Sequence, residues 1–428
     1  MTRRKAMRLW LVTVGEPLPT DVGNQRLLRT GILADVLHKR GHDVTWWTSA
    51  FNHQAKIFRQ YDDRVKELQP GYRIVFLKGC GYTHNFSFAR LRDHRQLARQ
   101  FRQFAPGMEL PDIIICSYPT IDLSRDAVQF GRERRIPVVL DIRDLWPDIF
   151  IDVLPRPCRW LGRLAALPLE AAARQAFRGA TAITGNTDEM VQWALRKVGR
   201  TASPSDKGFP MGYPEPFFSS SEMGKADAYW DSQGIARQKA GLVVCFFGTL
   251  GRQFAIERVL EAASRLNDKS SIMFVLCGSG DNLEKYRTLS AGLSNCLFPG
   301  WVDAPGIRSL MRRSDVGLAP YIQRKDFLSS YPNKPLEYFA GGLPVLSSLC
   351  AGPLANVLRE YDCGLTFDLN NPNALILVLD KLNTDRARCR EMGKNARKVY
   401  EQRFSATIVY NKMVDHLEHI AKYRGNIF

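Results

Sequence analysis

The sequence has no long hydrophobic run. Its longest apolar stretches, such as those at 242–247 and 272–277, have the length of a β-strand, whereas a membrane-spanning helix needs about 20 apolar residues. The chain starts with a basic segment, but the apolar stretch that follows at 9–14 is short and lacks a cleavage site, so it is typical of a first strand. We therefore expect a cytoplasmic protein without a membrane span.

Patterns that hold metals or disulfides are also missing. The nine cysteines form no C-x-x-C pair and the seven histidines do not cluster, which disfavours a zinc site and a disulfide framework. No D-x-D pair occurs in the sequence, which argues against Mg²⁺ or Mn²⁺ held by paired carboxylates. We expect neither a metal nor another cofactor.

Two further motifs are absent, while positive charge is abundant. No G-x-G-x-x-G follows the first predicted strand, which argues against a Rossmann dehydrogenase, and no nucleic-acid-binding motif is present. The net charge is nevertheless +17, and most of the excess lies in residues 1–200. Such a field suggests an anionic partner such as phospholipid, lipid-linked phosphate or nucleic acid. A basic polyanion-binding protein, with salt-sensitive affinity, is one alternative interpretation.

Strand-like and helix-like segments alternate along both halves of the chain, which is typical of parallel sheets covered by helices. In the first half, strands are predicted at 9–14, 44–48, 73–77, 112–116, 137–141 and 181–184. In the second half, strands are predicted at 242–247, 272–277, 296–299, 316–319 and 345–348. Helices are predicted between most of these strands.

A Pro-, Gly- and Ser-rich stretch at 203–221 separates the two halves. The sequence thus predicts an α/β protein of two Rossmann-like domains, 1–205 and 206–403, and a C-terminal helix at 404–428 that returns toward the first domain. Since ligands of open α/β sheets bind beyond the carboxyl ends of the strands, two facing domains imply a cleft between them.

The strongest site signal is the segment SSYPNKPLEYFAGGLPVLS at 329–347. Asn333 is expected to cap a helix whose first turn contains Lys334 and Pro335. Such a helix start offers free N–H groups, a positive dipole and an amine to a diphosphate. Glu337 lies three residues after Lys334, and its carboxylate can accept two ribose hydroxyls. Alternatively, these residues form an ordinary capped helix with a solvated charge.

Two glycine-bearing loops follow the first two strands of the second half. In FGTLGRQ at 247–253, Gly248 and Gly251 permit close approach of the backbone, and Arg252 can contact phosphate oxygens in a bidentate manner. CGSG at 277–280 follows the next strand. Each loop alone is a weak signal, but the carboxyl ends of one sheet bring such loops together.

These motifs resemble those of bacterial family 4 glycosyltransferases, especially the branch that makes O-antigen and capsular or exopolysaccharides. The matching pieces are GTLGR at 248–252, CGSG at 277–280, PGWV at 299–302, SDVGLAPY at 314–321, PNKPLEYFAGGLPV at 332–345, GHDVT at 41–45 and DIRDLWP at 141–147. The resemblance spans nearly the whole chain. It implies the GT-B fold, a nucleotide-sugar donor, and transfer with retention of anomeric configuration and without a metal.

The resemblance also implies roles for individual residues. Arg252 would neutralise the donor diphosphate as the nucleoside diphosphate leaves, and Asp144 would lie near the acceptor hydroxyl; both are predicted catalytic residues. The predicted donor-binding residues comprise the phosphate, ribose, base and sugar contacts: Gly23, Asn24, Gly248, Arg252, Gly278, Trp301, Val302, Ser329, Asn333, Lys334 and Glu337.

The sequence departs from the family pattern at two places. Relatives often carry two glutamates spaced E-x7-E, and here Ser329 stands at the first position. Asp326 is a candidate substitute, although a surface loop charge is the commoner explanation. Phe254 and Ala255 follow the GTLGR motif where relatives have lysine or glycine, so Lys334 is the candidate second phosphate cation. Asp144, beside Arg143, is either an inert ion-pair partner or a base.

Two basic and aromatic segments lie in the first half, at 86–104 and 156–163. In the first, Phe86, Phe88, Leu91, Ala98, Phe101 and Phe104 are expected on one side, interleaved with arginines. Such helices either lie on an anionic membrane or pack on the sheet with a solvated arginine face.

Together these features predict a retaining glycosyltransferase that moves a hexosyl or N-acetylhexosaminyl group. Its donor would be a UDP- or GDP-type nucleotide sugar, and its acceptor a lipid-linked or oligosaccharide glycan of polysaccharide or lipopolysaccharide biosynthesis. Contact with the inner face of the cytoplasmic membrane is expected, and contact with nucleic acid is not. The alternative enzyme is a nucleotide-sugar epimerase or hydrolase on the same fold, for which the few histidines in candidate loops give little support.

Overall fold

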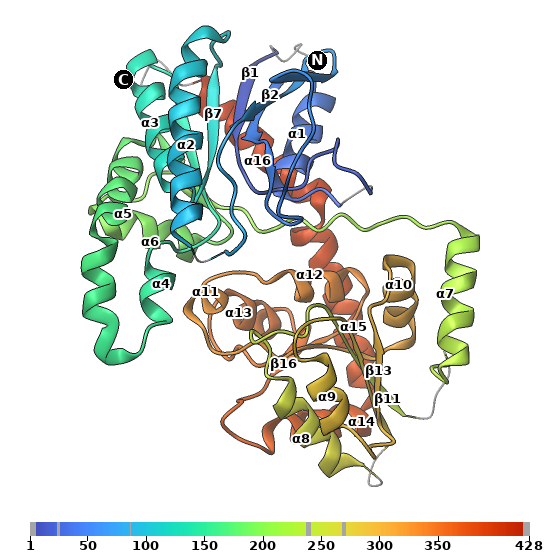
Figure 1. Cartoon of the computed structure of the whole chain (residues 1–428). Helices are drawn as coiled ribbons and strands as arrows, with labels where there is room; N and C mark the ends of the chain where they lie inside the picture. Colours follow the sequence, from blue (N-terminus) through green and yellow to red (C-terminus); the bar gives the residue numbers. More distant parts are fainter. Residues whose placement is uncertain (1–5, 24–25, 86, 237–240, 268–270, 423–428) are drawn as a thin grey trace. The chain divides into compact units, whose positions relative to one another are not determined.

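A computed structural model describes residues 6–23, 26–85, 87–236, 241–267 and 271–422. The chain divides into two compact units, Met1–Met211 with Val409–Phe428, and Gly212–Ile408. Each unit contains one large sheet with helices on its faces (Figure 1). The predicted α/β class with two Rossmann-like sheets is therefore confirmed.

The sheet of the first unit has the strand order β10-β9-β8-β7-β1-β2-β6-β5. All neighbours are parallel except β5 and β6. The bounds are β1 Arg8–Val12, β2 Asp43–Ser49, β5 Val65–Gln69, β6 Tyr72–Leu77, β7 Ile113–Tyr118, β8 Val138–Ile142, β9 Ala182–Gly185 and β10 Lys207–Gly208. The six predicted strands correspond to six of these. The short antiparallel pair β3 (Phe51–Asn52) and β4 (Ile57–Phe58) was not predicted.

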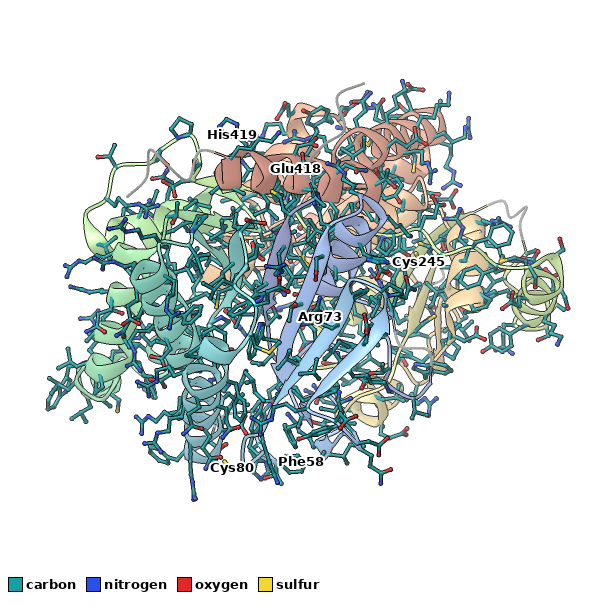
Figure 2. All side chains as sticks on the ribbon, turned by 90° about the horizontal axis from the view of Figure 1, so that it is seen from above. Phe58, Arg73, Cys80, Cys245, Glu418 and His419 are labelled. Carbon is teal, nitrogen blue, oxygen red and sulfur yellow. The ribbon has the colours of Figure 1, made fainter. Side chains whose placement is uncertain are left out.

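Helices cover both faces of this sheet (Figure 1). On one face, α3 packs between α2 and α5. On the other face lie α1 and α16. Figure 2 labels Glu418 and His419 of α16. The bounds are α1 Arg29–Lys39, α2 Phe88–Phe104, α3 Ile121–Arg134, α4 Asp148–Asp152, α5 Arg159–Gly179, α6 Asp188–Val198 and α16 Ala406–Lys422.

The core under α2 and α3 is aromatic. The ring of Trp10 on β1 stacks on Phe130 at a centroid distance of 5.5 Å and lies 4.9 Å from Trp47. Phe101 of α2 meets Trp47 edge to face at 5.1 Å. The predicted apolar side of α2 is therefore only partly right. Phe101 is buried, but Phe88 is 90% exposed, and Phe86 lies outside the described residues.

The last helix completes the first unit. Its inward residues Tyr410, Met413, Val414 and Leu417 are fully buried. Polar contacts also bind it to the α1–β2 turn, where His42 Nε2 lies 3.1 Å from Glu418 Oε1 and Arg40 Nη1 lies 2.6 Å from Asp415 Oδ1.

The sheet of the second unit is parallel throughout and has the order β13-β12-β11-β14-β15-β16. The strand bounds are β11 Leu242–Phe247, β12 Ile272–Cys277, β13 Cys296–Gly300, β14 Val316–Ala319, β15 Val345–Ser347 and β16 Gly364–Thr366. The helices are α7 Ser220–Ser232, α8 Ile256–Leu266, α9 Leu283–Leu289, α10 Ala304–Arg313, α11 Lys325–Leu328, α12 Asn333–Ala340, α13 Pro353–Glu360, α14 Ala374–Thr384 and α15 Arg386–Val399.

The strands predicted from 242 to 348 lie within one residue of these bounds, because continuous apolar runs and amphipathic helices alternate there. The stretch at 203–221 contains more regular structure than a linker would. Residues 207–208 form β10 on the edge of the first sheet, and α7 begins at Ser220 behind a capping box from Ser219 and Glu222.

A buried ion-pair network lies at the carboxyl ends of β8 and β1 in the first unit. The Arg29 guanidinium binds both Asp141 oxygens, at 2.8 and 2.9 Å, and donates to the carbonyls of Phe209 and Pro210. Arg143 contacts Asp141 at 3.0 Å and also pairs with Glu16. Arg29 thus fixes the segment that leaves the first unit.

We expect Arg29→Met to lower the free energy of unfolding of the first unit by about 3 kcal/mol, because Asp141 would keep its buried charge with one arginine fewer. Arg174→Met removes an i,i+4 partner of Glu170 from a half-exposed site and should cost less than about 0.5 kcal/mol. Urea unfolding followed by tryptophan fluorescence measures both. Equal losses in the two variants would contradict the role given to the network.

Candidate functional site

The strand order of the second unit contains one point where the chain direction across the sheet reverses. After β13 the chain crosses back to β14, which lies on the other side of β11. The loops that follow β11 and β14 therefore diverge, which leaves room for a ligand beyond the carboxyl ends of these strands. The predicted phosphate-binding loop at 248–253 follows β11, so it lies at this point.

Three loops join at these strand ends. The N–H of Gly248 donates to the carbonyl of Cys277 at 3.0 Å, and the N–H of Gly278 donates to the carbonyl of Gly300 at 2.7 Å. The N–H of Leu250 donates to the carbonyl of Ser279 at 2.8 Å. The predicted convergence of the glycine loops after β11 and β12 is thus present in the structure, and the end of β13 joins them.

Glycine is required where these loops touch. Gly278 has φ of +151°, and a Cβ on it would overlap the carbonyl oxygen of Gly248. Gly248 has φ of +141°, and a Cβ on it would overlap the Lys334 amine. A side chain at Gly278 would therefore displace the backbone of Gly248, and a side chain at Gly248 would displace the Lys334 amine.

Lys334 extends from the start of α12 into the β11 loop. Its amine lies 4.8 Å from the ring centroid of Phe254 and 5.5 Å from that of Phe246. Burial lowers the pKa of Lys334, and the charge of Glu337 opposes this shift. Lys334 is thus a desolvated cation at the carboxyl edge of the sheet, where an added anion would stabilise its charged form.

The predicted cap of α12 is wrong. The N-cap residue is Pro332, in extended conformation, and no side chain caps the helix; Asn333 is its first helical residue. The Asn333 side chain is exposed. Because the helix starts at Asn333, Glu337 lies in its second turn instead of its first, half-buried.

The other predicted donor residues of this unit lie on the same edge. Arg252 is exposed in the β11 loop, whose Phe254 pairs with Tyr321 after β14. Trp301, 73% exposed, and half-buried Val302 follow β13 directly. Ser329 ends α11, the short helix before α12. Asp326 on α11 binds Arg324 at 2.7 Å, so it is an ion-pair partner of that arginine.

In the first unit, the predicted residues occupy two loops. Asp144 is half-buried after β8, and its carboxylate accepts from the N–H of Leu145 at 2.9 Å. Its sequence neighbour Arg143 pairs with Asp141 and Glu16. Gly23 is exposed with φ of +92°. Asn24 lies outside the described residues.

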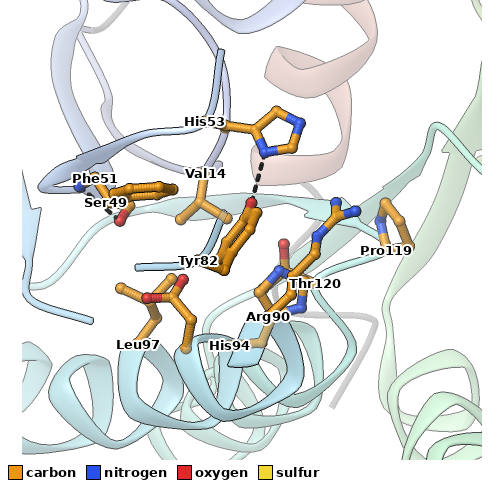
Figure 3. A pocket seen from close by; sticks show the side chains of 12 residues that line it. Val14, Ser49, Phe51, His53, Tyr82, Arg90, His94, Leu97, Pro119 and Thr120 are labelled. Carbon is orange, nitrogen blue, oxygen red and sulfur yellow. Dashed lines mark hydrogen bonds between the residues drawn. The ribbon is translucent and has the colours of Figure 1, made fainter. Parts of the chain in front are cut away.

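The first unit also has a cavity that the sequence analysis missed. Its strand order reverses between β1 and β7, and a cavity of about 170 Å³ lies beside the loops that follow these strands (Figure 3). The lining comprises Val14, Gly15, Ser49, Phe51, His53, Tyr82, Arg90, Asp93, His94, Leu97, Pro119 and Thr120. No compact motif marks these residues; Gly15 and Ser49 directly follow predicted strands, and Arg90, Asp93, His94 and Leu97 lie in the basic and aromatic segment at 86–104.

Burial controls the charge of this cavity. Burial, together with the positive charge of Arg90, lowers the pKa of His53 to about 4 and the pKa of His94 to about 3. Both rings are therefore neutral at neutral pH, and His53 Nδ1 lies 2.6 Å from the Tyr82 hydroxyl. Burial raises the pKa of Asp93, whose carboxylate accepts from the N–H of Gly81.

Within the described ranges, no three His, Cys, Asp or Glu side chains gather where they could hold a metal ion. The expectation that the reaction needs no metal stays a prediction. No helix among the residues described is long and apolar enough to cross a membrane.

We expect Gly278→Ala to destabilise the second unit by about 2 kcal/mol or more, because the added Cβ would displace the Gly248 carbonyl. Gly292→Ala is the matched control. Gly292 also has positive φ, +86°, but no atom lies within 4 Å of an added Cβ, so only the backbone cost of about 1 kcal/mol remains. Thermal melting measures both, and equal losses would contradict the role of close packing.

Two protein families match the chain, one in each half. The model of the "Glycosyl transferase 4-like domain" matches residues 29–204, and that of "Glycosyl transferases group 1" matches residues 231–399. An uncharacterized glycosyltransferase of Methanocaldococcus jannaschii is 24% identical over 182 residues. That match covers 40% of this chain and 45% of the curated relative.

Solved structures share the fold across almost the whole chain. Sucrose-phosphate synthase from Thermosynechococcus elongatus is 17% identical, with a TM-score of 0.70 over 97% of this chain and 99% of that one. HepE from Anabaena, in complex with UDP, is 15% identical, with a TM-score of 0.66 over 96% and 100%. WaaG, a glycosyltransferase involved in lipopolysaccharide biosynthesis, is 15% identical, with a TM-score of 0.62 over 96% and 99%.

These structural likenesses show the fold, and the family matches show the kind of protein that carries it. The match in the first half and the match in the second half each fall on one Rossmann-like sheet. The chain therefore belongs to the glycosyltransferases of the GT-B fold and the family 4 type.

Proposed function

We propose that this protein transfers a sugar from a nucleotide-sugar donor to a glycan acceptor, with retention of anomeric configuration and without a metal. The observation that carries the proposal is the placement of Lys334 at the carboxyl edge of the second sheet, where its desolvated amine meets the glycine loops. A diphosphate would restore the charge stabilisation that burial takes from this amine.

The donor would bind to the second unit, in the predicted nucleotide-sugar-binding domain at 206–403. Lys334 and Arg252 would contact the diphosphate, together with N–H groups of the loop at Gly248. Glu337 would bind the ribose, whereas Gly278, Trp301 and Val302 would border the base and Ser329 and Asn333 would lie near the sugar. HepE, which shares the fold, binds UDP, which supports a UDP-type donor over a GDP-type donor.

Catalysis would depend on charge stabilisation. As the sugar leaves the donor, negative charge grows on the diphosphate, and the guanidinium of Arg252 and the amine of Lys334 would stabilise that charge in place. In the predicted acceptor-side domain at 1–205, Asp144 would lie near the acceptor hydroxyl, and Gly23 and Asn24 would lie near the donor phosphates.

The acceptor would be a lipid-linked or oligosaccharide glycan of polysaccharide biosynthesis, and the basic first unit would contact the anionic inner face of the cytoplasmic membrane. The positive excess in residues 1–200 and the exposed apolar residues of α5 support this placement. WaaG, of the same fold, is involved in lipopolysaccharide biosynthesis, which supports a similar pathway. The transferred group would be hexosyl or N-acetylhexosaminyl.

We expect UDP to raise the melting temperature of the parent protein, since a ligand that binds only the folded state stabilises it. Lys334→Ala, Glu337→Ala and Arg252→Ala should each remove most of this shift, because each removes a contact to the nucleotide. Lys394→Ala, at an exposed lysine on α15 paired with Glu391, should keep the full shift. If the three variants respond like the parent, the site is assigned wrongly. GDP, ADP and TDP in the same assay identify the base.

Incubation with a radiolabelled nucleotide sugar distinguishes transfer from the alternative activities. A transferase should move the label into an extractable lipid or glycan when a membrane extract supplies the acceptor, and Arg252→Ala should reduce this by about a hundredfold or more. A hydrolase would release free labelled sugar, and an epimerase would return a labelled nucleotide sugar of changed configuration. Either product without labelled glycan would refute the proposal.

A further inference from the structure

The cavity of the first unit continues into an apolar groove. Arg90 lines both the 170 Å³ cavity beside β1 and β7 and a neighbouring apolar cavity of about 280 Å³. The second cavity is lined mainly by the apolar side chains of Phe88, Leu91, Trp146, Phe150 and Leu169. Polar groups lie on one side of Arg90 and hydrocarbon on the other.

A third cavity extends the groove between α2 and α5. It has a volume of about 810 Å³, within the range of ligand pockets, and it shares Phe88, Leu91 and Leu169 with the apolar cavity. Arg92 and Arg95 of α2 lie along its rim. Among the described residues that line the two apolar cavities, the charged side chains are arginines, and the Nε of Arg95 lies 3.9 Å from the carboxylate of Asp122.

Arg90 is held between the two environments. Its guanidinium lies 4.6 Å from the ring of Trp146 and 5.5 Å from the ring of Tyr82, and Nη1 donates to the Asn85 carbonyl at 3.0 Å. Its Nε is buried without a hydrogen-bond partner among the described residues. A buried donor without an acceptor is costly and rare, and Figure 3 shows the side chain reaching into the cavity.

The charge balance around Arg90 favours an anion. Lys56 lies beside His53 at 3.3 Å, and the charges of Lys56 and Arg90 add to burial in lowering the pKa of His53. The nearby carboxylate, Asp93, already accepts from Gly81. Guanidinium groups bind phosphate strongly and in a fixed geometry.

We propose that Arg90 binds the phosphate of a lipid-linked acceptor whose hydrocarbon chain lies in the groove between α2 and α5. This inference rests on the proposed transfer reaction and names the acceptor class of that reaction. The sugar end of the acceptor would enter the polar cavity at His53, Tyr82 and Thr120, on the other side of Arg90.

The surface beside the groove fits a chain that comes from a bilayer. Ala165, Pro168 and Leu169 of α5 line the groove, while Trp160, Leu161, Leu164 and Leu167 of the same helix are each more than half exposed. Trp160, Leu164 and Leu167 are spaced by four and then three residues, as one helical face requires. An apolar helical face beside an arginine-rimmed groove suits contact with anionic lipid.

The proposal is tested by direct binding of decyl phosphate below its micellar concentration, measured by equilibrium dialysis on the full chain. We expect decyl phosphate to bind about a hundredfold or more tighter than inorganic phosphate, since each methylene taken from water strengthens binding about fourfold. Decanol should bind much more weakly than decyl phosphate. Inorganic phosphate that binds as tightly as decyl phosphate would overturn the proposal and indicate a free-phosphate site.

Two variants separate the phosphate and chain contacts. Arg90→Gln should weaken decyl phosphate binding about tenfold or more, with Arg174→Gln on α5 as the matched control. Phe88→Ser should weaken decyl phosphate binding about tenfold and should leave folding intact, because Phe88 is exposed. Its control is Leu377→Ser, at a residue 63% exposed in the second unit. Unchanged binding in both test variants would overturn the proposal.

Two further measurements keep the outcomes distinct. All four variants should keep the UDP melting shift, so a loss of lipid binding is separable from damage to the donor site. If the transfer reaction fails but decyl phosphate binds through Arg90 and Phe88, the groove stands and the reaction does not. If the protein sediments with phosphatidylglycerol vesicles but does not bind monomeric decyl phosphate, the surface is a membrane contact and the lipid-chain groove is refuted.

Discussion

The close contact between Gly248, Gly278 and Lys334 is the constraint on which the second unit's candidate site depends. Hydrogen bonds join the loops after three parallel strands, and they approach so closely that no side chain fits at either glycine. The amine of Lys334 occupies the space beside Gly248 where a side chain would otherwise lie. The result is a junction of loops held by backbone hydrogen bonds, with one desolvated cation beside it whose charge an added anion would stabilise.

The two units have different side chains at the equivalent point of their sheets. In both sheets the chain reverses direction beside the first strand. In the second unit this point is lined by glycine loops and a lysine, whereas in the first unit it is lined by aromatic rings, two neutral histidines and an arginine. Small residues expose backbone to an anion, while large rings form walls against hydrocarbon or sugar. The same architecture thus offers one polar edge and one amphipathic edge.

Much of the second unit could be predicted from the sequence because its signals are local. A run such as Leu242–Phe247 is continuous and apolar since both faces of the strand are covered, and Gly248 marks its end. The error at Asn333 has a local cause too: Pro332 occupies the extended position that a capping side chain would need.

The features of the first unit that escaped prediction come from distant parts of the chain. Arg29 meets Asp141 across 112 positions, and Arg90 reaches a cavity built from β1, β2 and β7 loops. No periodicity encodes such pairs. The residues of DIRDLWP were noticed as a motif, but only the fold shows that Arg143 faces Asp141 and Glu16. Sequence patterns therefore located the glycine loops of the second unit far better than the cavity of the first unit.

The position of α16 also bears on how the protein is made. The first unit buries Tyr410, Met413, Val414 and Leu417, so a nascent chain that has emerged only to residue 211 lacks the side chains that seal one face of its sheet. The second unit, Gly212–Ile408, is contiguous and is available to fold before that face is closed. The half synthesised first would therefore be the half completed last, and an arrested or clipped chain would expose its sheet to aggregation.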